Sequence, residues 1–268
     1  MLTAVAAVII VAVLLITRHL YLWRPLDSTD FYPWKPFFMG HRGVMTRAPE
    51  NTLAAYAAAL AAGLKGNELD VMATRDGVLV CSHNFDLERV TDGTGYIYER
   101  TYDYLRVVNA AVCHPAAGHQ TIPRLEEVLD FFPPDFRLNI EVKTRGLWDI
   151  LPALQVARLV RRRRLQKRTI VSCFNPLALL GVKWVDETIL TGLLVENETW
   201  PLLRLINLAR PDCLHPEAGL VTDDLLRFVR QRGLALNVWT VNNRPAIDWL
   251  IKRGVDGIIT DRPEYCQL

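Results

Sequence analysis

The apolar positions of the chain follow one pattern near its start and another from about residue 37 onward. The first sixteen residues, MLTAVAAVIIVAVLLI, carry no charge. As an α-helix they would measure about 24 Å, and the following TRHLYLW extends the segment toward the roughly 30 Å of a hydrocarbon core. Arg18 can snorkel, and Tyr21 and Trp23 suit a membrane interface. The pattern predicts a retained transmembrane helix over 1–23.

The flanks of this segment argue against the alternative, a cleaved signal peptide. Such a peptide has Lys or Arg before its apolar run and a small-x-small cleavage site after it. Here the basic residues Arg18, Arg24 and Lys35 lie in or after the apolar segment, and no such cleavage site follows it. The positive-inside rule then places the body of the protein on the cytoplasmic side of a single-pass anchor. Residues 24–36, with Pro and polar positions, are expected to be a linker to a domain over 37–268.

From residue 37 onward, short β-rich runs alternate with helical patterns. The runs typical of strands are 37–41, 67–74, 78–83, 137–143, 169–174, 189–195, 212–216, 234–241 and 257–261. Helical patterns lie between most of them, over 52–62, 123–132, 147–164, 176–181, 200–209, 222–232 and 245–253. This alternation predicts an α/β fold with a parallel sheet, and seven or more units predict closure into a TIM-type (β/α) barrel. Chemistry in such barrels lies at the carboxyl ends of the strands.

One connection breaks the alternation, because only RDG separates the strands near residues 67–83. This is a hairpin signal and far too short for a parallel crossover. With a two-residue turn, His83 pairs with either Glu68 or Asp70, and both registers place it on the same face as those carboxylates. A three-residue loop would instead place His83 on the opposite face from Glu68 and Asp70.

Composition narrows the partners and the compartment. The 31 Lys and Arg residues nearly balance 29 acidic ones, so the chain lacks the strong positive field of a general nucleic-acid binder. Its five cysteines are scattered, with no Cys-x-x-Cys pair. This spacing argues against a disulfide framework or a zinc site and favours a reducing compartment.

Three carboxylates at strand positions indicate a cation site. Glu68 and Asp70 share one face of a strand, and Glu141 stands near the end of another apolar strand. Three carboxylates meeting at a barrel mouth repel one another unless a cation neutralises them. Ligand sets made only of oxygen suit Mg²⁺ or Ca²⁺.

Two histidines, His41 and His83, end strands close to this carboxylate group. A histidine pair titrating near neutral pH can supply a general acid and a general base together. The other histidines lack comparable neighbours, although His215 also lies at a strand end.

The order of motifs resembles the glycerophosphodiester phosphodiesterase family. The motifs are HRG, PENT, ELDV with TRDG, VCSHN with LERVTDGTG, IPRLEEVL, NIEVK, NVWTVN and GVDGIITDRP, over roughly 37–264. The resemblance implies a TIM barrel and divalent-metal-dependent hydrolysis of a phosphodiester. It assigns His41 and His83 to acid and base, and the three carboxylates to the metal. Arg42 and Lys143 are assigned to the phosphate.

Further residues have supporting roles in this interpretation. Glu50 and Asn51 are expected to support the site and begin a helix, and Trp239 to pack either against the substrate or in the barrel core. Asn84 is a departure, because the family usually has Asp after the second histidine. An amide can hydrogen-bond but lacks the charge that stabilises a protonated neighbour.

Two other functions stay open at this point, a phospholipase C or D on the same kind of barrel and a weakly active lipid- or metal-binding pseudoenzyme.

The basic run ARLVRRRRLQKR (157–168) has two interpretations. It is either a solvated helix face or a patch that contacts anionic lipid. The second, together with the anchor, predicts a preference for lysophospholipids over soluble glycerophosphodiesters.

Overall fold

The structure, a computed structural model, describes residues 2–197 and 202–266. The strands are β1 Phe37–His41, β2 Gly66–Ala73, β3 Leu79–Cys81, β4 Arg137–Val142, β5 Thr169–Cys173, β6 Leu190–Val195, β7 Cys213–Pro216, β8 Ala235–Val238 and β9 Gly257–Thr260. The α-helices are α1 Leu2–Tyr21, α2 Leu53–Ala61, α3 Tyr102–Leu105, α4 Leu125–Phe131, α5 Leu151–Arg162, α6 Pro176–Val185, α7 Leu202–Ala209, α8 Asp223–Arg232 and α9 Arg244–Lys252. The first two residues of the helix predicted over 200–209 lie outside the described residues.

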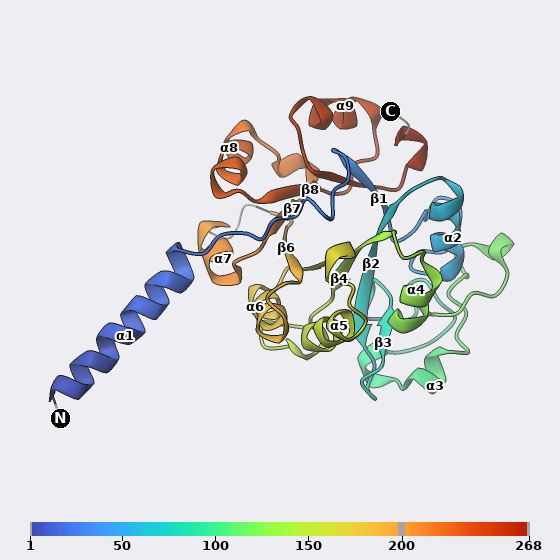
Figure 1. Cartoon of the computed structure of the whole chain (residues 1–268). Coiled ribbons are helices and arrows are strands. Elements are labelled where there is room, and N and C mark those ends of the chain that lie inside the picture. The colour runs from blue at the N-terminus through green and yellow to red at the C-terminus, as the bar shows by residue number, and fades with distance from the viewer. Residues whose placement is uncertain (1, 198–201, 267–268) are drawn as a thin grey trace.

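Eight parallel strands close into a barrel. The pairing order is β1-β9-β8-β7-β6-β5-β4-β2, and β1 also pairs with β2, which completes the ring. Helices α2 and α4 to α9 surround it (Figure 1). Strand β3 is additional and runs antiparallel to the outer part of β2. The predicted TIM-type barrel with one hairpin is therefore confirmed.

The predicted register of the hairpin is wrong. Val71 pairs with Cys81 and Ala73 with Leu79, which requires the three-residue loop 75–77. Strand β3 also ends at Cys81, so its register does not determine where His83 points. The chain bends after β3, and His83 reaches the barrel mouth from a loop rather than from a strand face.

The barrel is closed at its amino-terminal end by residues 24–36, here called the strap. Phe31 and Tyr32 are buried against the apolar side chains at that end of the barrel interior. Arg137 donates to the carbonyls of Asp30 and Phe31, and the backbone N–H of Leu26 donates to Asp212. The segment predicted as a linker thus connects α1 to β1 while packing onto the barrel.

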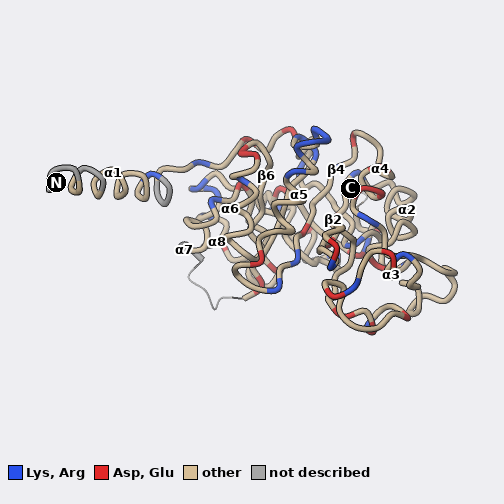
Figure 2. The backbone as a smooth tube through the Cα atoms, turned by 90° about the horizontal axis from the view of Figure 1, so that it is seen from below, with Lys and Arg blue, Asp and Glu red and all other residues tan. Residues whose placement is uncertain are grey.

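Helix α1 extends away from the barrel (Figures 1 and 2). Its apolar side chains that the structure describes are more than half exposed: Val5, Ile9, Ile10, Val11, Val13, Leu14, Leu15 and Ile16. Among the described residues, however, no helix has both the length and the apolar character needed to cross a membrane. The transmembrane span predicted over 1–23 is not confirmed.

Candidate active site

A cavity of about 300 Å³ opens at the carboxyl ends of the barrel strands. One wall is charged and comes from β1, β2, β4 and the loop after β3. The opposite wall is largely apolar. The lining residues are His41, Arg42, Glu68, His83, Asn139, Glu141, Lys143, Phe174, Leu194, Glu196, Trp239 and Ile259.

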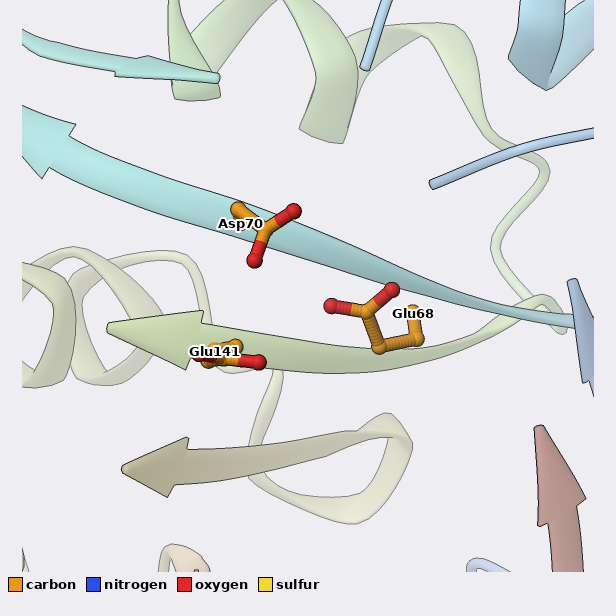
Figure 3. A group of neighbouring side chains, drawn as sticks. All are labelled: Glu68, Asp70 and Glu141. Carbon is orange, nitrogen blue, oxygen red and sulfur yellow. The ribbon is translucent and has the colours of Figure 1, made fainter. Parts of the chain in front are cut away.

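The three predicted metal ligands come together on the charged wall. Glu68, Asp70 and Glu141 each present a carboxylate oxygen within 4.8 Å of the others, and all three are buried (Figure 3). Parallel pairing of β2 with β4 sets Asp70 beside Glu141. Burial and the neighbouring carboxylates raise the pKa of Glu68 well above its usual value, and burial also raises the pKa of Glu141.

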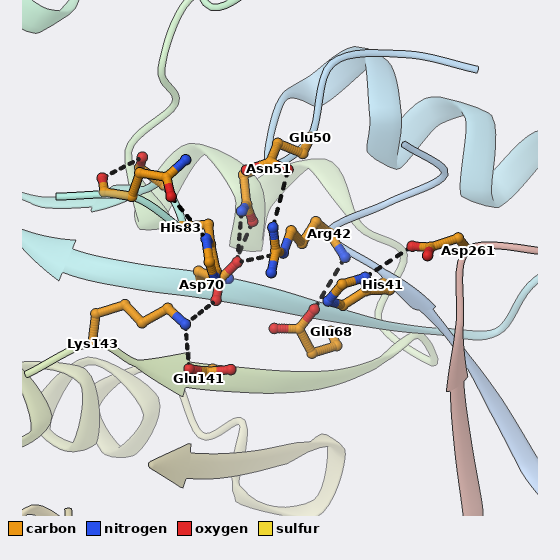
Figure 4. A network of polar contacts seen from close by, with 12 residues as sticks. His41, Arg42, Glu50, Asn51, Glu68, Asp70, His83, Glu141, Lys143 and Asp261 are labelled. Atoms are coloured by element: carbon orange, nitrogen blue, oxygen red, sulfur yellow. Dashed lines mark hydrogen bonds and ion pairs between the residues drawn. The ribbon is translucent and has the colours of Figure 1, made fainter. Parts of the chain in front are cut away.

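Two cations lie among these carboxylates (Figure 4). The Nζ of Lys143 is 2.9 Å from Asp70 Oδ1 and also contacts Glu141. The Nε of Arg42 is 3.2 Å from Asp70 Oδ2, an ion pair without hydrogen-bond alignment. Although burial alone raises the pKa of Asp70, these cations outweigh it and hold the pKa below its usual range. The same carboxylates raise the pKa of Lys143 despite its burial.

Asn51 holds Asp70 in place, as the supporting role predicts. Its Nδ2 donates to Asp70 Oδ2 at 2.8 Å, and its Oδ1 accepts from the Asp70 backbone N–H and from the Tyr56 hydroxyl. Glu50 accepts from Arg42 at 3.0 Å. Both Arg42 and Asn51 have positive φ, at 54° and 57°, so the backbone of this loop is bent to bring their side chains toward β2.

His41 ends β1 and is oriented by a residue that the sequence analysis did not select. Its Nδ1 lies 2.8 Å from Asp261 Oδ1, just after β9. Asn242 donates to the other carboxylate oxygen of Asp261. Burial raises the pKa of Asp261, but the hydrogen bond and charge interaction with His41 outweigh burial and lower it. This contact with Asp261 fixes the orientation of the His41 ring.

His83 has a different partner. Its Nδ1 lies 3.2 Å from the amide oxygen of Asn84. Burial lowers the pKa of His83, and the charges of Lys143 and Arg42 add to this, while Asp70 opposes it. The ring is therefore held toward its neutral form.

The opposite wall carries Trp239 and Phe174, whose rings meet edge to face with centroids 5.8 Å apart. The indole N–H of Trp239 donates to the carbonyl of His215 at 2.7 Å. Trp239 thus lines the cavity and is also tied to the barrel wall. His215 itself lies inside the barrel, where burial lowers its pKa to about 3, and it contacts Asn237 rather than the cavity.

The residues present fit a divalent cation. Glu68 Oε1 is buried without a hydrogen-bond partner, and the donor set is made only of carboxylate oxygens. The raised pKa values of two of the three carboxyls show that local positive charge is insufficient for all three to ionise easily. A hard cation such as Mg²⁺ or Ca²⁺ would supply it.

Sequence reasoning missed Asp261, Phe174, Asn139 and Glu196 as cavity-facing or orienting residues. Asp261 and Phe174 are the last residues of two predicted strands, so applying the strand-end rule to every strand would have found them. Asn139 lies two residues before Glu141, on the same face of β4, and both its amide atoms are buried without a partner. Because side chains on one strand face recur every second residue, the prediction of Glu141 as a site residue could have been extended to Asn139.

Comparison with known proteins agrees with this geometry. The sequence profile described as the glycerophosphoryl diester phosphodiesterase family matches residues 41–265. A glycerophosphodiester phosphodiesterase of Caldanaerobacter subterraneus is 33% identical over 239 residues, covering 86% of this chain and 96% of the relative.

Two solved structures resemble the fold closely. One is a phosphodiesterase of Oleispira antarctica in complex with the product sn-glycerol-3-phosphate, with TM-score 0.82 and 26% identity over 90% of this chain and 98% of that one. The other is a glycerophosphodiester phosphodiesterase of Thermotoga maritima, with TM-score 0.68 and 30% identity over 86% of this chain and 96% of that one.

Proposed function

Because the chain belongs to the glycerophosphoryl diester phosphodiesterase family, we propose that it hydrolyses a glycerophosphodiester to glycerol 3-phosphate and an alcohol. The observation that carries this proposal is a cavity lined by His41, His83, Glu68 and Glu141, with the Asp70 carboxylate buried beside the other two carboxylates. A phosphodiester needs a base, an acid and charge stabilisation at one phosphorus atom, and this cavity contains groups suited to each.

We assign the acid and base from the partners of the two histidines. His83, held toward its neutral form, removes the proton of the attacking hydroxyl. That hydroxyl belongs either to water or to the neighbouring glycerol carbon. His41, oriented by Asp261, gives its proton to the oxygen of the departing alcohol as the bond from phosphorus to that oxygen breaks. Arg42 and Lys143 offset charge on the remaining phosphoryl oxygens.

Glu68, Asp70 and Glu141 are the residues that would hold the divalent cation. When bound, Mg²⁺ or Ca²⁺ supplies Lewis-acid stabilisation of phosphoryl charge and lowers the pKa of a nearby hydroxyl. Arg42 and Lys143 also form ion pairs with Asp70, one of these carboxylates.

Metal removal tests this part of the proposal. EDTA should abolish hydrolysis of glycerophosphocholine, and Mg²⁺ or Ca²⁺ should restore it, because the donor set is hard. Glu68→Gln and Asp70→Asn should weaken metal affinity, measured by calorimetry. Glu126→Gln, at a partly exposed position of α4 outside the cavity, is a control that removes the same charge. Full activity in chelator, or restoration by Zn²⁺ alone, would contradict a hard-cation site.

The substrate is expected to be a glycerophosphodiester, and a lysophospholipid is the second candidate. Phe174, partly exposed, and Trp239 form an apolar wall that can accept an alkyl group. Product analysis on glycerophosphocholine, lysophosphatidylcholine and phosphatidylinositol separates these candidates from a phospholipase C or D. Absence of turnover on all of them would favour a pseudoenzyme.

Association with a membrane through α1 completes the proposal. The apolar side chains of α1 are exposed along the described helix, and the basic residues that follow it favour a cytoplasmic catalytic domain. Fractionation of the full chain, compared with a chain starting at Asp27, and protease protection of sealed membranes test attachment and orientation separately.

A further inference from the structure

The amino-terminal end of the barrel carries a second charged cavity, at the opposite end from the active site. Its volume is about 710 Å³, and it lies beneath the strap, between α4 and the start of β5. The cations Arg137, Arg164, Lys167 and Arg168 line it, against only two carboxylates, Asp30 and Asp130. We call these four cations the basal cluster.

Three of the four basal-cluster cations, Arg164, Lys167 and Arg168, belong to the basic run, and the fold neutralises other cations of that run. Arg162 pairs with Glu126 at 2.6 Å, and Arg163 pairs with Asp130, so both are compensated by α4. Arg164 follows them with a positive φ of 56°, which turns the chain at the end of α5. Figure 2 shows Lys and Arg segments gathered beside α5 and β4 at this end of the molecule.

Two members of the cluster are held by hydrogen bonds to backbone carbonyls. Arg137 donates to the carbonyls of Asp30, Phe31 and Asp135, and Arg168 donates to those of Pro133 and Phe136. A carbonyl positions a guanidinium but carries no full negative charge to neutralise it. Both guanidinium groups also have N–H donors that are not used in these hydrogen bonds. Within the described part of the chain, neither guanidinium has a carboxylate ion pair.

The two guanidinium charges repel each other. Burial lowers the pKa of Arg168, and the charge of Arg137 lowers it further, while Asp135 opposes this in part. Lys167 does reach a carboxylate, Asp30, at 3.1 Å, but both side chains are largely exposed, so this pair is weak. A cluster of fixed forks with unused donors is suited to a phosphate group.

The position of the cluster beside the strap indicates which kind of molecule would carry the bound phosphate group. Arg137 bonds to the strap itself, and the strap continues directly into α1. A single residue, the exposed Leu22, separates the end of α1 from the buried Trp23. The strap, which packs onto the amino-terminal end of the barrel, therefore begins directly where α1 ends.

We propose that the basal cluster binds the phosphate of an anionic lipid headgroup, with the active-site mouth directed away from that lipid surface. This inference rests on the association of α1 with a membrane proposed above. It also opposes the lysophospholipid preference that the sequence predicts, because a mouth facing the aqueous phase favours soluble glycerophosphodiesters over lysophospholipids in the same membrane.

Lysine labelling in the full chain tests the site directly. The protein is incorporated into phosphatidylcholine vesicles with or without phosphatidic acid, and labelling by an amine-reactive reagent is followed by mass spectrometry. Lys167 should react about fivefold more slowly with phosphatidic acid present, the effect of roughly one cation at an anionic surface. Lys252, exposed at the end of α9, is the internal control and should not change.

A matched pair of variants separates the site from general charge. Arg164→Gln/Lys167→Gln removes two cluster cations, one of them paired with a carboxylate. Arg227→Gln/Lys252→Gln removes the same charge from α8 and α9, again with one paired cation. The first pair should weaken binding to vesicles containing phosphatidic acid about tenfold or more by cosedimentation, and the second should not.

Three results would overturn the inference. They are equal labelling of Lys167 in both kinds of vesicle, equal binding losses for the two variant pairs, and equal protection of Lys167 by inorganic phosphate in pure phosphatidylcholine vesicles. The last would identify a soluble phosphate as the occupant. Turnover of glycerophosphocholine should be unchanged in the cluster variant. If the unaltered protein does not hydrolyse glycerophosphocholine, that result would instead refute the proposed function.

Discussion

His41, at the end of β1, and His83, in the loop after β3, face the same cavity, yet their Nδ1 atoms meet different partners. His41 is 2.8 Å from the carboxylate of Asp261, whereas His83 is 3.2 Å from the neutral amide of Asn84. The carboxylate of Asp261 carries a charge that the amide of Asn84 lacks, whereas the His83 ring is held toward its neutral form by burial and by the charges of Lys143 and Arg42. The comparison teaches that two histidines of equal promise in the sequence acquire different surroundings once the barrel closes.

The largest expected effect comes from removing either ring. His41→Ala and His83→Ala should each lower kcat by about 10²–10⁴, the range for loss of a general acid or base. Steady-state kinetics on glycerophosphocholine, with metal affinity and circular dichroism as controls for the fold, checks this. A variant with near-normal kcat would show that its histidine is structural. The acid and base roles could then not be divided between the two histidines.

A smaller effect should follow from removing the partners instead of the rings. Asp261→Asn should lower kcat about 10- to 100-fold, because a hydrogen bond to a charged group contributes about 1.5–3 kcal/mol. Asn84→Ala, the matched change at the other histidine, should cost less than tenfold. Equal losses in the two variants would contradict the assignment of the charged partner to the acid.

Making the two partners alike should shift the pH profile rather than the maximum rate. Asn84→Asp places an anion beside His83, which favours its protonated form. Because His83 acts as a base when neutral, the acidic limb of kcat should move about one pH unit upward. Asn84→Gln is the uncharged control. An unmoved limb would mean that position 84 does not influence the catalytic histidine.

The smallest effect concerns stability. The pKa of Asp261 is lowered in the folded state, so its contribution to the free energy of unfolding is present above the unfolded pKa of about 3.9 and is lost as pH falls through the folded value. Asp261→Asn should therefore lower Tm by about 2–4 °C at pH 7, with a smaller difference at pH 3. Asn84→Ala should show no such dependence on pH. A pH-independent difference for Asp261→Asn would argue against the ion pair.

Elements with strong local signals were predictable. Strand β1 matches its predicted range, and the other strands and the barrel helices agree within a few residues, because buried parallel strands and amphipathic helices have distinct hydrophobic patterns. The convergence of Glu68, Asp70 and Glu141 was predictable as well, since barrel closure brings carboxyl strand ends to one rim. The hairpin register was not, because two- and three-residue turns through RDG are both compatible with the local sequence.

By itself the sequence determined the order and kind of the elements, the identity of the two histidines and the three carboxylates, and the apolar character of the first helix. Only the tertiary structure decided which atoms meet across long separations. It paired His41 with a residue 220 positions away, packed the strap beneath the barrel, and set acids of α4 against part of the basic run. The physical reason is that periodicity and turn chemistry act over a few residues, whereas partners and charge balance depend on distances that exist only once the barrel has closed.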